Sequence, residues 1–361
     1  MYDFMRKYAL VLSSNIENAP YINYYVDVFN EHKIDFIVFY WNKESLKKKY
    51  EYPVVSYDKS FSVHSSKLSK IINICKYVRF IRRTLKQENI TDLILFTIPP
   101  SIFLYSFLVK YYWKHFILDI RDYSPLVPFC SSWLGKVVNA SFRTCISSEG
   151  FLSWLPNHSN YILSHNLRKS LLVQNNDDSI CFENHSKICI LTIGQIRDYN
   201  MNSEVLQILM SYQSDFVLHY AGYGVVYDRL QRLSVNQKNV FFVGRYMKED
   251  EYKIIQPCDF INALTSVDAL NKDIMTNRFY LSILYYKPLL VSAGTYQAVL
   301  VEKYGLGIVV KDIRQLPDLI KRYYKTFDFY DFKNRCMTVQ KIVFQDILKF
   351  EKELLEFIKV G

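Results

Sequence analysis

Short apolar runs rich in β-branched and aromatic residues alternate with segments of helical period along the chain, and this alternation restricts the fold more than any other feature. Such runs predict buried strands joined by crossover helices, which build a parallel sheet covered on both faces. In the first half the predicted strands are Tyr8–Ser13, Asp35–Tyr40, Leu93–Thr97, Phe116–Ile120, Cys145–Ser148 and Tyr161–Ser164. In the second half they are Ile188–Ile193, Phe216–Tyr220, Val240–Val243, Phe260–Ala263, Leu289–Val291 and Gly307–Val309.

The chain of 361 residues suits two α/β domains of ordinary size. We expect one doubly wound domain over residues 1–167 and a second over residues 187–340. The polar residues of 168–186 predict a linker. Residues 341–361 predict a helix that closes the structure, with packing back on the first domain left open. Because open parallel sheets bind ligands at the carboxyl ends of their strands, the two domains are expected to face each other across a cleft.

Composition excludes several classes of protein. The seven cysteines contain no C-x-x-C pair, so the sequence indicates neither a zinc site nor a disulfide framework, and a reducing, cytosolic compartment fits best. The uncharged, largely apolar stretch Leu93–Val109 is shorter than a membrane span and is interrupted by Pro99-Pro100. A net charge of +10 predicts attraction to polyanions. Nucleic acid is not expected, because no nucleic-acid-binding motif accompanies the charge.

The most informative segment begins at Asp273 and continues through Asn277-Arg278-Phe279-Tyr280 to Lys287-Pro288 and a buried strand. The amino terminus of a helix carries unpaired N–H groups and partial positive charge, which suit a diphosphate. Arg278 would add charge-assisted hydrogen bonds there. The alternative is an ordinary helix that Asn277 caps, with Arg278 as a solvated charge.

Glycines follow three predicted strands of the second half. Gly194 is followed by Arg197, which is suited to phosphate oxygens, and Gly222 and Gly244-Arg245 repeat the arrangement. Glycine after a strand is also the commonest way to turn toward a helix, so these turns alone carry little information.

In the first half, Asp119-Ile-Arg121-Asp122 ends a predicted strand shortly before Pro125. A carboxylate in this place, beside an arginine, can orient an acceptor hydroxyl or the transferred sugar, and Asp122 is the candidate for that catalytic role. An ion network among these charged side chains that fixes the loop is an equal alternative. Further candidates for the loops near an acceptor are Ser14, Asn15, Arg121 and His165.

These segments resemble GT-B glycosyltransferases of the retaining, bacterial surface-polysaccharide type. The resemblance is carried by Asp119–Pro125, Gly194–Arg197 and Asn277–Pro288. It implies transfer from a nucleotide-diphosphate sugar without a metal or other cofactor, with the acceptor bound by the domain of residues 1–167 and the nucleotide sugar by the domain of residues 187–340. The donor site would contain Gly194, Arg197, Gly222, Gly244, Arg245, Asp273, Asn277, Arg278 and Tyr280. The family usually has a second acidic residue where this chain has Leu281, which leaves the ribose contact and the stereochemical course open.

A basic stripe follows the predicted helix of residues 67–86. Leu68, Ile71, Cys75, Val78, Ile81 and Leu85 are expected on its buried face. Lys76, Arg79, Arg83 and Lys86 recur on an adjoining face at steps of three and four. Such a stripe predicts docking on an anionic membrane, although a solvated basic helix explains it equally well.

The sequence therefore predicts a glycosyltransferase at the cytoplasmic face of the plasma membrane. Its partners would be a nucleotide sugar and a glycan or polyprenyl-linked acceptor in surface-polysaccharide synthesis, as the resemblance implies. A nucleotide-sugar 2-epimerase of the same fold and a catalytically silent partner protein are the alternatives.

Overall fold

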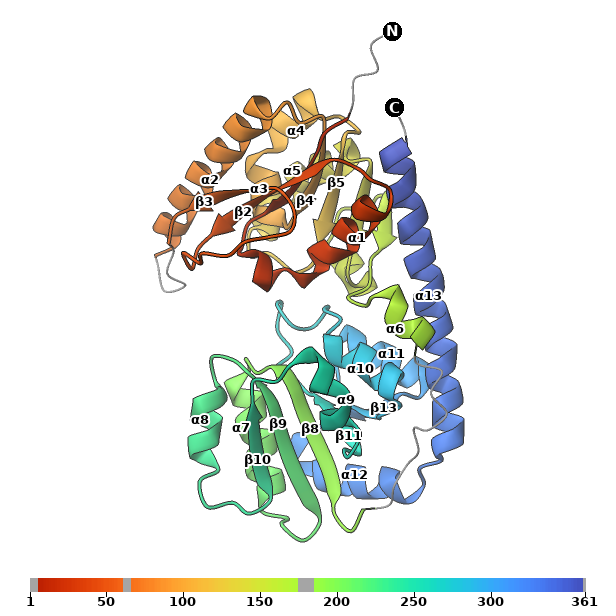
Figure 1. The fold of residues 1–361 in the computed structure, drawn as a ribbon. Helices are drawn as coiled ribbons and strands as arrows, with labels where there is room; N and C mark the ends of the chain where they lie inside the picture. The colour runs from red at the N-terminus through yellow and green to blue at the C-terminus, as the bar shows by residue number, and fades with distance from the viewer. Residues whose placement is uncertain (1–5, 61–65, 175–184, 360–361) are drawn as a thin grey trace. The chain divides into compact units, whose positions relative to one another are not determined.

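A computed structural model of the protein describes residues 6–60, 66–174 and 185–359. The chain divides into two compact units (Figure 1). Unit 1 contains Met1–His165 and Asp346–Gly361, and unit 2 contains Asn166–Gln345. Each unit holds one parallel sheet with helices against it, so the prediction of two doubly wound α/β sheets is confirmed.

The sheet of unit 1 has the strand order β3-β2-β1-β4-β5-β6-β7. Its strands are β1 (Tyr8–Leu12), β2 (Phe36–Asn42), β3 (Val54–Asp58), β4 (Asp92–Phe96), β5 (Phe116–Ile120), β6 (Arg143–Ile146) and β7 (Tyr161–Leu163). All six strands predicted in the first half are present, within a few residues at their ends. The sequence analysis missed β3, an edge strand that is only partly buried and so lacks the apolar run of a central strand.

Helices of unit 1 cover this sheet. They are α1 (Asn23–Glu31), α2 (Lys67–Gln87), α3 (Ile98–Phe103), α4 (Tyr105–Tyr111) and α5 (Val127–Ala140). One face of the sheet packs Leu10, Val38 and Ile94 against Tyr25 and Phe29 of α1. Burial of these apolar side chains is the main force that holds helix and sheet together.

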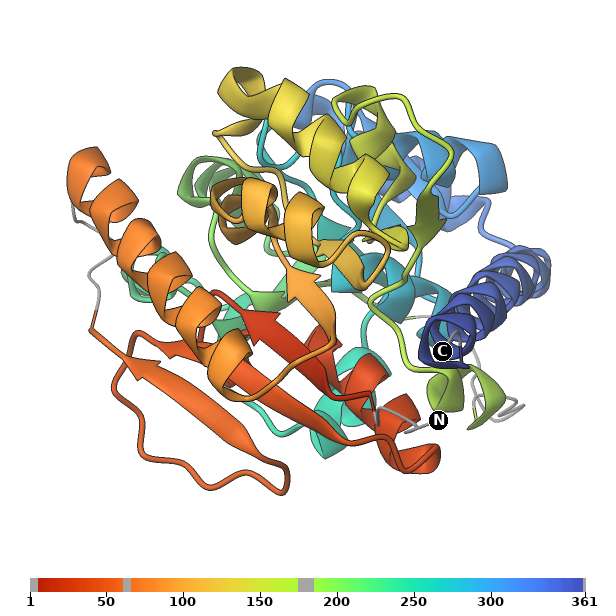
Figure 2. The same ribbon diagram turned by 90° about the horizontal axis from the view of Figure 1, so that it is seen from above.

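The expected buried face of α2 is only half correct. Val78, Ile81 and Leu85 are buried, but Leu68 is 68% exposed and Ile71 is 43% exposed. Figure 2 shows the reason, because the amino-terminal half of α2 projects away from the sheet and leaves these side chains without a packing surface.

The sheet of unit 2 has the strand order β10-β9-β8-β11-β12-β13. Its strands are β8 (Ile188–Gln195), β9 (Phe216–Tyr223), β10 (Val240–Gly244), β11 (Phe260–Ala263), β12 (Leu289–Ser292) and β13 (Gly307–Val310). All six were predicted, and β8 and β9 run two or three residues further than expected. The chain reverses direction across the sheet between β8 and β11, and this switch point is where doubly wound sheets bind ligands.

The helices of unit 2 begin inside the predicted linker. They are α6 (Lys169–Gln174), α7 (Tyr199–Met210), α8 (Tyr227–Leu233), α9 (Glu251–Ile255), α10 (Asn277–Tyr285), α11 (Tyr296–Tyr304) and α12 (Leu316–Lys325). Residues 175–184, which contain most of the polar run of the predicted linker and also Cys181, lie outside the described residues.

The carboxy-terminal stretch forms one helix, α13 (Phe329–Lys359). Its last part belongs to unit 1, where the Arg6 guanidinium donates to the Phe357 carbonyl and Arg143 pairs with Glu353 at 2.6 Å. In the part of the chain that the structure describes, no helix combines the length and apolar character needed to cross a bilayer.

Candidate functional site

Glycines bring the carboxyl ends of β8 and β9 unusually close in unit 2. Gly194 and Gly222 are paired across the two strands and have φ values of +90° and +117°. A Cβ on Gly222 would lie 2.0 Å from the Gly194 carbonyl oxygen, and one on Gly224 would lie 2.0 Å from that of Ile196. Only glycine fits these positions. The close approach explains the conformations of Gly194 and Gly222 without any ligand.

Arg278 crosses the end of β8 from the first turn of α10. Its Nε donates to the Ile193 carbonyl at 2.8 Å and its Nη2 to the Gln195 carbonyl at 3.3 Å. Burial, together with the nearby positive charge of Arg197, lowers the pKa of Arg278 to about 10. The guanidinium is thus held at the edge of the sheet in a partly desolvated environment, where an anion would bind strongly.

Arg197 lies on the loop directly after β8. It is exposed, and its guanidinium donates to the side chain of Gln195. Among the described residues, neither Arg197 nor Arg278 forms a salt bridge with a carboxylate. Two neighbouring guanidinium groups without acidic partners concentrate positive potential at this edge.

The amino terminus of α10 adds to this potential. The cap residue is Thr276, and its hydroxyl donates to Gln297 at 2.9 Å instead of capping the helix. No side chain caps the first turn. The Phe279 N–H donates to the Thr276 carbonyl at 3.1 Å, and the N–H groups of Asn277 and Arg278 are left for solvent or a ligand. Asn277 is exposed at the first helical position and is not the cap.

The next turn of α10 faces the core. Tyr280 is 1% exposed, a position that favours packing over direct contact with a donor. Leu281 is 7% exposed. This position, where the sequence resemblance would lead one to expect an acidic side chain, is therefore an apolar packing position. Asp273 lies in the preceding loop, with its carboxylate 3.8 Å from the Lys272 ammonium. Lys287, at the other end of the helix, is buried and donates to the Gln256 carbonyl.

The end of β10 contributes Gly244 and Arg245. Gly244 has a φ of +77° at a bulge in the pairing of β10 with β9. The Arg245 guanidinium is exposed and lies 4.9 Å from the centre of the Tyr223 ring. This stacking explains how the side chain is held, and its cation stays accessible to an anion.

Asp198 is a structural residue of the site to which the sequence analysis assigned no role. Its carboxylate accepts the Met201 N–H at 3.1 Å, which caps α7, and the Ser266 N–H at 2.6 Å. Asp198 therefore ties the loop after β8 to the loop after β11. Its place directly before a helical segment is the signal of an amino-terminal cap.

We predict that Asp198→Ala lowers the free energy of unfolding by about 1–2 kcal/mol at neutral pH. Partial burial alone would raise the pKa of Asp198, but the N–H groups of Ser266 and Met201 lower it. A lowered pKa stabilises the fold above the unfolded value of about 4, and this contribution is lost as the pH falls through the folded pKa. Urea unfolding at pH 7 and pH 3 checks this, and an undiminished difference at pH 3 would contradict it.

In unit 1, Asp119 and Arg121 form a buried ion pair at the end of β5. Asp119 is 0% exposed and Arg121 5%, and their side chains meet at 2.5 Å. The Tyr25 hydroxyl donates to Asp119 at 2.6 Å, and Arg121 also donates to the Ser164 carbonyl at 3.0 Å. Burial acts to lower the pKa of Arg121, but Asp119 raises it overall. Asp119 and Arg121 thus form the kind of ion network, fixing the loop, that the sequence left open as an alternative.

The other candidates of unit 1 differ in exposure. Asp122 is exposed just beyond the ion pair. Asn15 is 1% exposed and donates to Asn42 at 2.9 Å, so it ties the loop after β1 to the end of β2. Ser14 is half-buried, and its hydroxyl donates to the Asn15 carbonyl. His165 pairs with Asp346 of α13 at 3.1 Å.

The predicted basic stripe of α2 is exposed along its length. Lys76, Arg79, Arg83 and Lys86 are all exposed. The Lys86 ammonium lies 5.7 Å from the centre of the Tyr111 ring, and Tyr111 and Trp113 are about half-exposed. Cationic and aromatic side chains therefore share this surface.

No family model and no curated protein sequence matches the chain. Solved structures do. The lipopolysaccharide outer core galactosyltransferase WaaB is 13% identical with a TM-score of 0.65, covering 97% of this chain and 99% of that one. HepE of Anabaena, in complex with UDP and glucose, is 12% identical with a TM-score of 0.64, covering 98% and 99%. A UDP-N-acetylglucosamine 2-epimerase is 12% identical with a TM-score of 0.54, covering 91% and 90%. The chain has the two-sheet architecture of these proteins, which is the GT-B fold.

Proposed function

We propose that the protein transfers a glycosyl group from a nucleotide-diphosphate sugar, with the donor held at the carboxyl edge of the unit 2 sheet. The observation that carries this proposal is the convergence of Arg197, Arg278 and the uncapped amino terminus of α10. WaaB and HepE, whose fold this chain shares, support it because the first is a galactosyltransferase and the second was solved with UDP and glucose.

The chemistry needs charge stabilisation at this edge. When the bond between the anomeric carbon and the diphosphate oxygen breaks, negative charge develops on the departing nucleoside diphosphate. Guanidinium groups and helix N–H groups fixed beforehand stabilise that charge without reorganisation. The acceptor hydroxyl forms the new bond to the anomeric carbon and releases its proton to a base.

Asp122 is proposed to orient the acceptor hydroxyl or to take its proton. It is exposed at the carboxyl end of β5, while Asp119 and Arg121 beneath it are neutralised by each other. We expect Asp122→Asn to lower kcat/KM for transfer by about 100-fold with little change in stability. The assay follows radiolabelled sugar into the acceptor fraction. The control is Asp312→Asn in unit 2, which removes the charge of a partly exposed carboxylate paired with Arg314 and should retain activity.

The acceptor is proposed to be a glycan, carried on a polyprenyl lipid, of a bacterial surface polysaccharide, with the protein on the cytoplasmic face of the plasma membrane. The lipopolysaccharide substrate in the name of WaaB supports this class of acceptor. The exposed surface of α2 supports the location, because the exposed Leu68, Ile71 and Ile72 precede the four cations of the basic stripe. Apolar side chains beside cations are the composition of a surface that binds an anionic bilayer.

Vesicle binding tests this location. Each cation near an anionic surface contributes about 1 kcal/mol, so Arg79→Ala with Arg83→Ala should weaken binding to anionic vesicles roughly 30-fold. The matched control replaces the exposed Lys341 and Lys349 of α13 by alanine and keeps binding. Equal losses in both double variants would leave only a net-charge effect and would contradict docking through α2.

A first experiment screens thermal stability against UDP, GDP, CMP and dTDP sugars. We expect one nucleotide to raise the melting temperature of the protein, and no response to any of them would favour the catalytically silent alternative. Incubation with the donor alone addresses the epimerase alternative, which the third structural likeness favours. Isomerised sugar in that incubation would replace the transferase proposal.

A further inference from the structure

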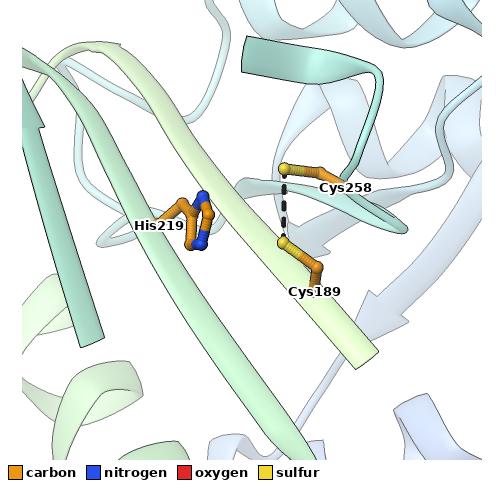
Figure 3. A group of neighbouring side chains, drawn as sticks. All are labelled: Cys189, His219 and Cys258. Atoms are coloured by element: carbon orange, nitrogen blue, oxygen red, sulfur yellow. Dashed lines mark hydrogen bonds between the residues drawn. The ribbon is translucent and has the colours of Figure 1, made fainter. Parts of the chain in front are cut away.

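Two cysteines and a histidine that are far apart in the sequence meet on the sheet of unit 2 (Figure 3). Cys189 is the second residue of β8, His219 lies in β9, and Cys258 lies two residues before the start of β11. The Sγ atoms of the two cysteines are 3.3 Å apart, and one donor atom from each of the three residues lies within 4.8 Å of the others.

The strand register explains the meeting. β8 lies between β9 and β11, and His219 pairs with Leu191, two residues after Cys189. Because side chains alternate between faces, Cys189 and His219 share one face of the sheet. The apolar core formed with Ile190 and Leu218 lies on the other face.

We propose that Cys189, His219 and Cys258 form a binding site for a zinc ion. Thiolate sulfur and imidazole nitrogen are the donors that zinc prefers, and a set of two cysteines and one histidine is an established zinc ligand set. Two thiolates neutralise the charge of the dication, so the bound ion leaves no net charge in this buried place.

The distances suit a metal better than a disulfide. With bonds of about 2.3 Å to sulfur and about 2.0 Å to nitrogen, a tetrahedral zinc ion holds its donors roughly 3.5–3.8 Å apart. The two sulfur atoms, 3.3 Å apart, are close to this separation, and all three donor atoms lie within 4.8 Å of one another. A disulfide needs sulfurs at about 2.05 Å, and both cysteines are free thiols here.

Neighbouring groups hold the ligands in place. Asp259 follows Cys258 in the sequence, and its carboxylate accepts the Cys189 N–H at 2.7 Å and pairs with His185 at 3.1 Å. These contacts hold the backbone of Cys189 close to that of Cys258. The His219 ring contacts Phe241, with the ring centres 5.3 Å apart. Such support is what keeps metal ligands oriented.

The site lies away from the proposed donor site. Cys189 is near the beginning of β8, whereas Arg278 contacts the carbonyls of Ile193 and Gln195 at its end. A zinc ion here would join three adjacent strands and stabilise the sheet. Three protein ligands leave the fourth position to water, which can approach because His219 is only half-buried.

The test uses the whole chain, reduced and freed of metal by a chelator. Cobalt(II) is titrated first, because thiolate ligands give it charge-transfer absorption, and zinc is then titrated in competition with a chromophoric chelator. We expect one zinc ion per chain, and Cys189→Ser, Cys258→Ser or His219→Ala should weaken binding at least about 100-fold. The exposed Cys75 is the control, and Cys75→Ser should bind zinc unchanged.

A second measurement does not depend on variants. Zinc should slow alkylation of Cys189 and Cys258 in the wild-type protein, read by mass spectrometry of peptides, and leave Cys75 unaffected. It should also raise the melting temperature by roughly 5 °C at a hundredfold excess over the dissociation constant. Absence of the cobalt band and of protection would overturn the proposal, and so would a Cys189–Cys258 disulfide in the freshly isolated protein.

Discussion

Replacing Arg278 by alanine is expected to weaken the binding of the cognate nucleoside diphosphate at least about 100-fold. The guanidinium is held at the end of β8 by two backbone carbonyls and has no carboxylate partner among the described residues. Hydrogen bonds from a charged donor contribute about 1.5–3 kcal/mol each, so losing two of them to a diphosphate corresponds to at least 100-fold in affinity. Calorimetric titration measures the loss directly.

The controls separate a binding role from a structural one. Arg314→Ala removes an exposed arginine of unit 2 that already pairs with Asp312, and it should leave nucleotide affinity unchanged. Arg278→Lys keeps the charge but not the fork of donors, so it should recover only part of the affinity. If Arg278→Ala binds nucleotide as the wild type does, while its melting temperature falls, the arginine only braces the loop after β8.

The second large effect concerns the buried pair of unit 1. We expect Asp119→Ala to lower the free energy of unfolding by about 3–5 kcal/mol, because it leaves the Arg121 guanidinium buried without its counter-charge. The Tyr25 hydroxyl loses its acceptor in the same variant. Asp122→Ala, three residues further and exposed, should cost less than about 1 kcal/mol.

Tryptophan fluorescence reports this effect selectively. The four tryptophans of the chain are Trp41, Trp113, Trp133 and Trp154, and all belong to unit 1. Urea unfolding followed by their emission therefore isolates the unit that contains Asp119. A midpoint for Asp119→Ala equal to that of Asp122→Ala would contradict the assignment of a stabilising ion pair.

The fold could be predicted because its signal is repeated. Twelve of the strands each give a short apolar run, and the helices between them impose parallel pairing. The strand that was missed, β3, lies at the edge of its sheet, where half-exposed side chains need not be apolar. The amino-terminal half of α2 was expected to be buried on one face but is exposed there. Helical periodicity predicts the apolar face of a helix, but it does not predict how far the sheet beneath the helix extends.

The site could be predicted only where one local segment determines it. Arg278, Arg197 and the start of α10 follow from neighbouring residues in the sequence. Asn15 and Tyr280 are predicted as site residues, but their surroundings could not be predicted, because Asn15 donates to Asn42 at the end of β2 and Tyr280 faces the core. Those partners are set by tertiary packing.

The cysteine cluster illustrates long-range assembly most clearly. Cys189 and Cys258 are 69 positions apart and show none of the close spacing by which zinc sites are found in sequences. The order of three strands in a sheet brings them together with His219. The site therefore depends on the strand order of the sheet and cannot be recognised in any single segment of the sequence.

The central claim is that the edge of the unit 2 sheet binds the diphosphate of the donor. The most direct test is a crystal structure with the nucleotide found in the thermal screen. The account predicts diphosphate oxygens within hydrogen-bond distance of the Arg278 guanidinium and of the first N–H groups of α10. A nucleotide bound with its diphosphate away from both groups would contradict it.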